Sequence, residues 1–225
     1  MRFTKKEKKA KEEEQKQEPE EQIITMLNGA FDKPELRVTG IYGDITEEKC
    51  SETIWGLLAL HETGKNLVPV LTEGAELEKD EHLYEETYTP IDFYISSYGG
   101  SASEMFSVYD VIRSLRDYTP IKTCGIGKVM SAGVLLLASG TKGERKIGRH
   151  CRVMIHGVIS GQHGHLQDVE NEFEEAKLTQ KLYIKALASE TDMTEKHIKK
   201  LMDRKTNVYI DAEKAVELGI ADIIV

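Results

Sequence analysis

The sequence predicts an α/β fold, in which a largely parallel sheet is built from successive strand–helix–strand units. Three apolar stretches of strand length, 36–45, 91–96 and 121–126, are each followed by a segment with apolar residues at helical spacing. That order joins parallel neighbouring strands through right-handed crossovers. With 225 residues, of which 40% are hydrophobic, the chain can enclose one core. We expect a single domain over 23–225.

The first 22 residues are almost entirely Lys, Glu and Gln. Such a segment cannot bury enough apolar surface to offset the entropy of ordering it, so we expect a disordered, charged tail over 1–22. A second polar stretch, the acidic segment 73–89, is typical of a surface loop or an insertion. Neither segment suggests chemistry.

Composition excludes several classes of function. The net charge of −9 and the lack of a basic face with interleaved aromatics argue against nucleic-acid binding. No apolar run reaches the roughly 20 residues of a membrane span, and no apolar segment follows Met1 as a secretory signal would. Three separated cysteines without metal-ligand spacing predict buried thiols and no metal site. We therefore expect a soluble, cytoplasmic protein.

The stretch 123–139 carries the strongest functional signal. A buried strand over 121–126 and a glycine-containing turn lead to an apolar helix that begins at or beside Ser131. The free N–H groups and the dipole of a helix N-terminus stabilise the negative charge that develops when a nucleophile attacks. Ser131 is therefore a candidate nucleophile, and the Ala132 N–H beside it is a candidate oxyanion donor. The alternative is that Ser131 only caps the helix.

Two further elements end at the edge of the sheet where Ser131 is expected. His156 ends the apolar strand 152–156 and is a candidate general base, because side chains converge on the crevice at the carboxyl ends of parallel strands. Gly99 and Gly100 break the strand 91–96, and paired glycines allow close approach of a ligand to backbone N–H groups. A structural histidine and a plain tight turn are the alternatives.

The C-terminal third is predicted to be mainly helical. A Gly/Ser/His loop over 157–164 precedes a long helix over 166–189, with apolar residues on one face. Thr194 and Asp211 are candidate N-caps of two shorter helices that end near Met202 and Leu218. A hydrophobic strand over 221–225 closes the chain.

Several motifs, in the same order, are similar to those of the proteolytic subunit of the Clp protease (the ClpP family). The resemblance covers about 22–225. Ser-Tyr-Gly-Gly-Ser at 97–101 is similar to the family's Ser-Pro-Gly-Gly-Ser turn, and 127–133 is similar to its Gly-x-Ala-x-Ser-Met-Gly nucleophile segment. Further similar segments lie at 138–143, 152–156 and 212–222.

The resemblance implies a ClpP/crotonase-like spiral of βαβ units with a protruding handle helix, the handle region covering about 157–190. It also implies a serine endopeptidase with Ser131 as nucleophile and His156 as general base, and with Gly100 and Ala132 as oxyanion donors. Extended peptides would pair beside 100–102 and 157–160. This adds Gly99, Ser101, Gly157 and Val158 as substrate-binding residues.

The third member of the catalytic triad departs from the family pattern. The family places an aspartate two residues before an aromatic residue, and with Tyr209 as that aromatic the position falls on Asn207. Asp203 is the alternative if the register slips. Asparagine can orient an imidazole but cannot stabilise the imidazolium by charge. Tyr98 and Ala132 also replace the family's proline and methionine.

The resemblance further implies heptameric rings, stacked as a tetradecamer, and an AAA+ Clp unfoldase that delivers unfolded polypeptides. The subunit itself would need no cofactor, because only the unfoldase uses ATP. Two other functions stay open. Asn207 favours a catalytically weak structural or regulatory subunit of a mixed ring, whereas the shared spiral architecture would also suit a crotonase-type acyl-CoA enzyme, which has no use for the Ser/His pair.

Overall fold

The computed structural model describes residues 36–69, 84–204 and 206–225. By its contacts the chain divides into Met1–Leu36 and Arg37–Val225, and the helices and strands assigned in the described residues lie in the second unit. The predicted tail over 1–22 and most of the acidic stretch 73–89 fall outside the described residues.

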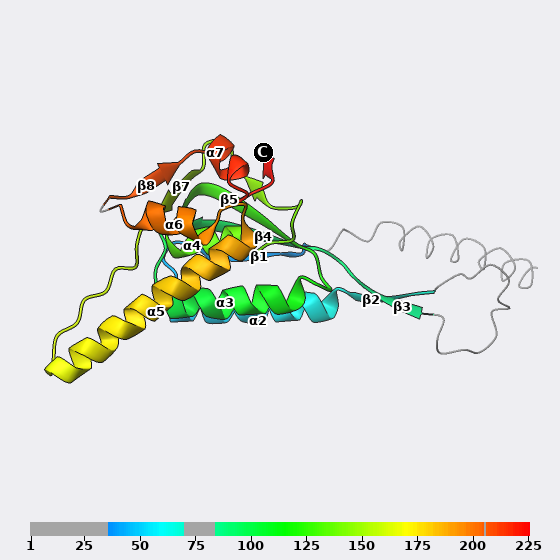
Figure 1. The fold of residues 1–225 in the computed structure, drawn as a ribbon. Helices are drawn as coiled ribbons and strands as arrows, with labels where there is room; N and C mark the ends of the chain where they lie inside the picture. The colour runs from blue at the N-terminus through cyan, green and yellow to red at the C-terminus, as the bar shows by residue number, and fades with distance from the viewer. Residues whose placement is uncertain (1–35, 70–83, 205) are drawn as a thin grey trace, which may run out of the picture. The chain divides into compact units, whose positions relative to one another are not determined.

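The main sheet confirms the predicted α/β class (Figure 1). Its strands are parallel at every pairing except that of β7 with β8, which is antiparallel. Strand β5 is the centre, because it pairs with β4 on one side and with both β6 and β7 on the other. The sheet order is β1 (Val38–Tyr42), β4 (Ile91–Ser97), β5 (Ile121–Met130), β6 (Lys146–Ile147) and β9 (Ile223–Ile224), with β7 (Arg152–Ile155) and β8 (Val208–Ile210) on a branch.

The helices cover the sheet as the crossovers require. Helices α2 and α3 run side by side along one face (Figure 1). The predicted N-caps Thr194 and Asp211 each accept a hydrogen bond from the backbone N–H three residues further on, and so do Thr46 and Ser101. The assigned helices are α2 (Glu47–Thr63), α3 (Ala102–Leu115), α4 (Ala132–Ala138), α5 (Leu166–Glu190), α6 (Glu195–Met202) and α7 (Ala212–Glu217).

The core lies between the sheet and α3 and α4. Every residue of α4 is buried, and the side chains of Leu135, Leu136 and Leu137 are inaccessible to solvent, as is that of Phe93 on β4. Because α4 is enclosed along its whole length, its first turn is held rigidly against the ends of the neighbouring strands. The core thereby positions the residue that precedes α4.

Strand β5 is longer than predicted. The strand expected to end at residue 126 continues to Met130, because Gly127 does not terminate it. Instead the pairing with β4 shifts between Ile95 and Ser97, and Gly127 adopts a φ of 64°, which places a β-bulge inside the strand. The closing strand is shorter than predicted, since only Ile223–Ile224 pair in the sheet.

The acidic segment was predicted as a loop, and part of it is a strand. Residues Tyr84–Tyr88 form β3, which pairs antiparallel with β2 (Lys65–Pro69) in a separate two-stranded sheet. Its base is anchored by aromatic stacking, because the rings of His61 and Tyr88 lie parallel with centroids 4.6 Å apart. Lys65 and Glu86 also form an ion pair across the two strands.

Helix α5 is the protruding helix of the predicted fold (Figure 1). Its first ten residues are exposed apart from Val169, which is half-buried, and its buried side chains come only from the second half. The charges are segregated along its length. The first half carries acidic residues and the second half lysines: Asp168, Glu170, Glu172, Glu174 and Glu175, then Lys177, Lys181 and Lys185.

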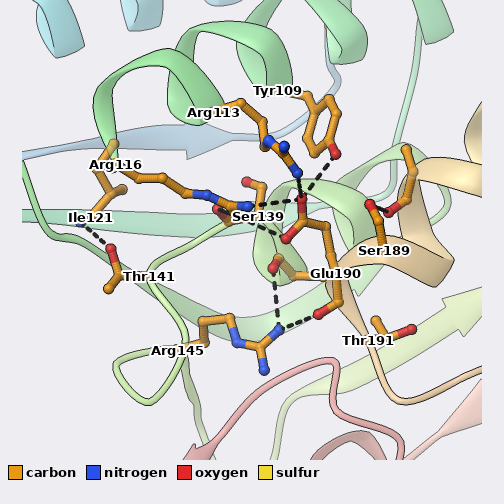
Figure 2. Close-up of polar contacts among 12 residues, drawn as sticks. Tyr109, Arg113, Arg116, Ile121, Ser139, Thr141, Arg145, Ser189, Glu190 and Thr191 are labelled. Carbon is orange, nitrogen blue, oxygen red and sulfur yellow. Dashed lines mark hydrogen bonds and ion pairs between the residues drawn. The ribbon is translucent and has the colours of Figure 1, made fainter. Parts of the chain in front are cut away.

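A buried polar cluster ties the C-terminal ends of α4 and α5 together (Figure 2). The carboxylate of Glu190, with no exposed surface, accepts hydrogen bonds from Tyr109 at 2.9 Å, Arg113 at 2.8 Å and Arg116 at 2.7 Å. Burial alone would raise the pKa of Glu190, but these hydrogen bonds outweigh it and hold the pKa below its ordinary value.

Arg145 makes a second set of contacts in this cluster. It donates to the carbonyl oxygens of Ala138 and Glu190, at the ends of α4 and α5, and forms an ion pair with Asp222.

Some features are absent from the part of the chain that the structure describes. None of its helices is long and apolar enough to cross a membrane. Within the same residues, no group of three His, Cys, Asp or Glu side chains is placed to hold a metal ion. Cys50, Cys124 and Cys151 are buried free thiols, as predicted.

Candidate active site

Ser131 occupies a sharp turn between β5 and α4. Its backbone has φ 53° and ψ −121°, and it is the one non-glycine residue with positive φ among the described residues. Its hydroxyl makes no capping hydrogen bond to α4, so the alternative that Ser131 serves as a side-chain N-cap is wrong. Positive φ in a residue with a side chain is strained, and such strain persists only where the surroundings impose it.

Three hydrogen bonds impose this conformation. The N–H of Ser131 donates to the carbonyl oxygen of Met154 on β7 at 2.8 Å. The carbonyl oxygen of Ser131 accepts from the N–H of Val134 at 3.0 Å and from the hydroxyl of Tyr183 on α5 at 3.1 Å. The turn is therefore held on its strand side by β7 and on its helix side by α4 and α5.

Gly99 packs directly against the serine. A Cβ atom added to Gly99 would lie 2.6 Å from the Ser131 Cβ and 3.1 Å from its Oγ, and the φ of Gly99 is 104°. No side chain can approach this closely, so the turn after β4 requires glycine at this position. The predicted closeness of the two elements is confirmed.

Two backbone N–H groups near Ser131 are free to bind a ligand. Gly100 follows Gly99, and the neighbouring Gly99 carbonyl and Ser101 N–H both bond to Ile45. Across residues 36–69, 84–204 and 206–225, neither the Gly100 N–H nor the Ala132 N–H donates to a protein acceptor. Unpaired donors beside a serine hydroxyl are what an oxyanion hole requires.

His156 extends from the carboxyl end of β7. Its Nδ1 lies 2.5 Å from the carbonyl oxygen of Gly157. A carbonyl can only accept, so Nδ1 carries the proton of this hydrogen bond. In the neutral ring Nε2 is then unprotonated and can accept a proton, which is the form a general base needs.

One pocket of about 360 Å³ contains most of the predicted site residues. Of these, Gly100, Ser101, Ser131, Ala132, His156, Gly157 and Val158 line it. Tyr98, Ala102 and Ile159 also line it, and they lie in segments that the family resemblance had already drawn attention to. The lining residues that the sequence did not indicate come from α3, α5 and α6: Met105, Thr179, Tyr183 and Met202. In the sequence, Tyr183 lies on the same predicted helix face as Leu187, and this pattern predicts a core side chain and gives no indication of a pocket residue.

Asn207 and Asp203 do not line this pocket. The last pair of the β7–β8 ladder is Ile155 with Val208, so His156 and Asn207 stand opposite each other one step beyond it. Asn207 is thus adjacent to the histidine, but in the described residues no hydrogen bond joins His156 to Asn207 or to Asp203. The Gly157 carbonyl is the group that orients the imidazole here.

Two contacts hold the walls of the pocket. Gln180 on α5 accepts a hydrogen bond from the Val158 N–H at 3.0 Å, which fixes the segment after His156 against the helix. On the other side, the Lys128 ammonium lies 4.6 Å from the centroid of the Tyr98 ring. Tyr98 lines the pocket and is 63% exposed, so its ring forms part of the rim and the Lys128 cation helps to hold it there.

Comparisons of the sequence with known proteins match it to one family. The Clp protease family model matches residues 82–225, which is more than half of the chain. A curated relative, the ATP-dependent Clp protease proteolytic subunit 2 of Treponema pallidum (strain Nichols), is 34% identical over 131 residues. The match spans 58% of this chain and 64% of the relative, a little under two thirds of the relative's length.

Proposed function

Because the chain belongs to the Clp protease family, we propose that it is a proteolytic subunit, a serine-type endopeptidase that hydrolyses unfolded polypeptides. One observation carries the proposal. The strained Ser131, the imidazole of His156 and the unpaired N–H groups of Gly100 and Ala132 all line one pocket. Serine acyl transfer needs these three kinds of group together.

The groups have complementary roles in the reaction. The Ser131 Oγ attacks the carbonyl carbon of the scissile peptide bond while the His156 Nε2 takes its proton. The oxyanion is stabilised by the N–H groups of Gly100 and Ala132. When the intermediate collapses, the C–N bond breaks and His156 returns the proton to the leaving amine. A water molecule, deprotonated by His156, then hydrolyses the acyl-enzyme and restores the serine.

Asn207 is proposed as the third group, in the place of the family's aspartate. Its position opposite His156 beyond the end of the β7–β8 ladder supports this role. An amide oxygen there can accept the hydrogen bond that the Nδ1–H of His156 now donates to the Gly157 carbonyl. Because it carries no charge, it stabilises the imidazolium less than a carboxylate does, so we expect slow turnover.

An extended peptide substrate is proposed to lie between two segments of the pocket wall. The first begins at Gly100 and the second at Gly157, and both leave the sheet at its carboxyl edge. Main-chain hydrogen bonds to such edges bind peptides with little dependence on sequence. The Val158 N–H already bonds to Gln180, so its carbonyl is the group left for the substrate.

Assembly into rings, stacked through α5, is proposed from the family and from this helix. Helix α5 is acidic in its first half and carries lysines in its second half. Two copies of α5 that run antiparallel are therefore complementary, with the acidic half of each facing the lysines of the other. Active sites would then face an internal chamber, and access would limit what is cleaved. The relative's name includes ATP-dependent activity, which supports an AAA+ unfoldase as partner.

One alternative is favoured by a specific observation. The lack of a hydrogen bond from His156 to Asn207 or Asp203 in the described residues would suit a catalytically weak subunit that serves a mixed ring. Such a subunit has no reason to keep the strained Ser131 or the two free N–H groups. These features favour the peptidase.

Hydrolysis of an unstructured fluorogenic peptide by the purified full-length chain tests the proposal. We expect steady hydrolysis that Ser131→Ala abolishes, whereas Ser114→Ala, which removes a hydroxyl exposed on α3, leaves the rate unchanged. A native mass measurement checks that each variant has the same assembly state. An assembled wild-type protein that hydrolyses no peptide would contradict the peptidase and favour the structural subunit.

A further inference from the structure

Tyr183 connects the long helix α5 to the turn that carries Ser131. It is 7% exposed and lies in the second half of α5, fifty-two residues further along the chain. Its hydroxyl donates to the Ser131 carbonyl oxygen at 3.1 Å. Burial raises the pKa of this phenol, so it stays protonated and remains a donor throughout the neutral range.

The accepting carbonyl belongs to a particular peptide group. The C=O of Ser131 and the N–H of Ala132 are the two ends of the same planar amide. A donor that fixes the carbonyl oxygen therefore also fixes the direction of the N–H of Ala132, a residue that lines the pocket. Hydrogen bonds in a chain polarise one another, so a donor at the oxygen makes the N–H a stronger donor.

We propose that Tyr183 is a positioning residue, which orients and polarises the amide that holds the oxyanion. The proposal rests on the proposed peptidase function, since only a reaction with an oxyanion uses the Ala132 N–H in this way. Tyr183 touches neither the substrate carbonyl nor the serine hydroxyl in this account. It acts through the peptide group between Ser131 and Ala132 alone.

The strained backbone gives this contact its importance. At φ 53° the Ser131 turn is held by the Met154 carbonyl on one side and by Val134 and Tyr183 on the other. The Val134 N–H donates to the same carbonyl, but from within the first turn of α4, so it is a local bond that would not by itself prevent rotation of the Ser131–Ala132 amide. Tyr183 is the side-chain contact from a separate element that opposes such a rotation.

Tyr183→Phe is the variant that tests the proposal, because it removes only the hydroxyl. The matched control is Tyr109→Phe, which removes another buried phenol hydroxyl, one that donates to Glu190 at 2.9 Å outside the pocket. Both variants lose a buried hydrogen bond, and Tyr109→Phe should be destabilised at least as much as Tyr183→Phe, because its partner is a carboxylate. Only Tyr183→Phe should change the chemistry.

Steady-state kinetics with a fluorogenic peptide provide the readout, with active sites counted by titration with a fluorophosphonate. Removing a direct oxyanion donor costs about 10²–10³ in kcat, so we expect an indirect loss of about tenfold for Tyr183→Phe, with KM within about twofold. A peptide boronate, whose adduct mimics the tetrahedral intermediate, should lose affinity by the same factor. Tyr109→Phe should keep the wild-type kcat for each titrated site.

The possible results separate the two proposals. A wild-type kcat in Tyr183→Phe, or equal losses in both phenylalanine variants, would overturn the role of Tyr183 while leaving the peptidase intact. A wild-type protein that neither hydrolyses peptide nor reacts with the fluorophosphonate would overturn both. If Tyr183→Phe does not fold, 3-fluorotyrosine at position 183 keeps the shape with a more acidic phenol. A kcat above wild type then supports the proposal, because the more acidic phenol is a stronger donor, and a kcat equal to or below wild type contradicts it.

Discussion

The backbone N–H of Ser131 donates to the carbonyl oxygen of Met154 at 2.8 Å, two residues before His156. This hydrogen bond continues the pairing of β5 with β7 past Met130, the last paired residue of β5. The serine and the histidine are therefore brought to the same edge of the sheet by strand pairing itself. Their separation depends on the register of two core strands, which the buried side chains of Val129 and Val153 secure.

Gly99→Ala should disable the site. The added Cβ would lie 2.6 Å from the Ser131 Cβ, and a φ of 104° is unfavourable for alanine. Because the serine must move, we expect a loss of more than about 100-fold in kcat/KM in a peptide assay. Gly143→Ala is the control, since its φ is 87° but nothing lies within 4 Å. It should cost about 1–2 kcal/mol from backbone strain and leave kcat/KM unchanged.

Asn207→Asp should raise kcat if Asn207 orients His156. A carboxylate at this position would stabilise the imidazolium, and the reverse exchange in a serine protease costs about 10⁴ in turnover. We expect a gain of at least about tenfold, measured with a fluorogenic peptide at neutral pH. Asp203→Asn decides between the two candidates. A large fall in kcat for that variant, with none for Asn207→Ala, would assign the role to Asp203 instead.

Glu190→Gln should destabilise the fold while leaving the chemistry of Ser131 unaltered. The substitution removes the charge that Arg113 and Arg116 contact, and breaking a buried ion pair costs about 3–5 kcal/mol. Since Arg113 is 46% exposed at its side chain, we expect the lower end, about 3 kcal/mol. Urea denaturation measures the change. Glu174→Gln, which breaks an exposed pair with Lys177, should cost less than about 0.5 kcal/mol.

Stability should fall on acidification, and Glu190 and Asp222 should account for part of the loss. Burial raises the pKa of each, but the arginine hydrogen bonds outweigh it, so the folded pKa values lie below the ordinary 4.5 and 3.8. A lowered folded pKa means that the native state binds fewer protons, so this stabilisation is complete above about pH 4.5 and is lost as the pH falls through the folded values.

The measurement is urea denaturation at a series of pH values from about 6 to about 3. We expect the free energy of unfolding to fall less steeply with acidification in Glu190→Gln than in the wild type, because the amide does not titrate. Parallel pH profiles for the two proteins would show that Glu190 does not contribute through its carboxylate.

Much of the site could be predicted because its signals are local. Ser131 and the pair Gly99–Gly100 follow short apolar strands, and parallel strands that end at the same edge of a sheet bring such residues together. His156 was found in the same way. Predicting these four residues required knowing only where the strands end, and not which side chains pack together.

The remainder depends on contacts between distant segments. In the sequence, Tyr183 and Glu190 have no feature that distinguishes them from other residues of an amphipathic helix. In the structure, Tyr183 contacts the Ser131 turn, and Glu190 is buried against arginines more than seventy residues away in the chain. Gly127 reads as a turn but forms a bulge, because β7 continues the pairing beyond it. Strand β3 was missed since its glutamates suggest a solvated loop.

Covalent labelling tests most directly whether Ser131 is the nucleophile. The assembled wild-type protein is treated with a fluorophosphonate, digested, and searched for the modified peptide by mass spectrometry. We expect one adduct, on Ser131, that is absent from Ser131→Ala and retained in Ser114→Ala. A folded, assembled wild type that carries no adduct, or one that carries it on another serine, would contradict the assignment of the active site.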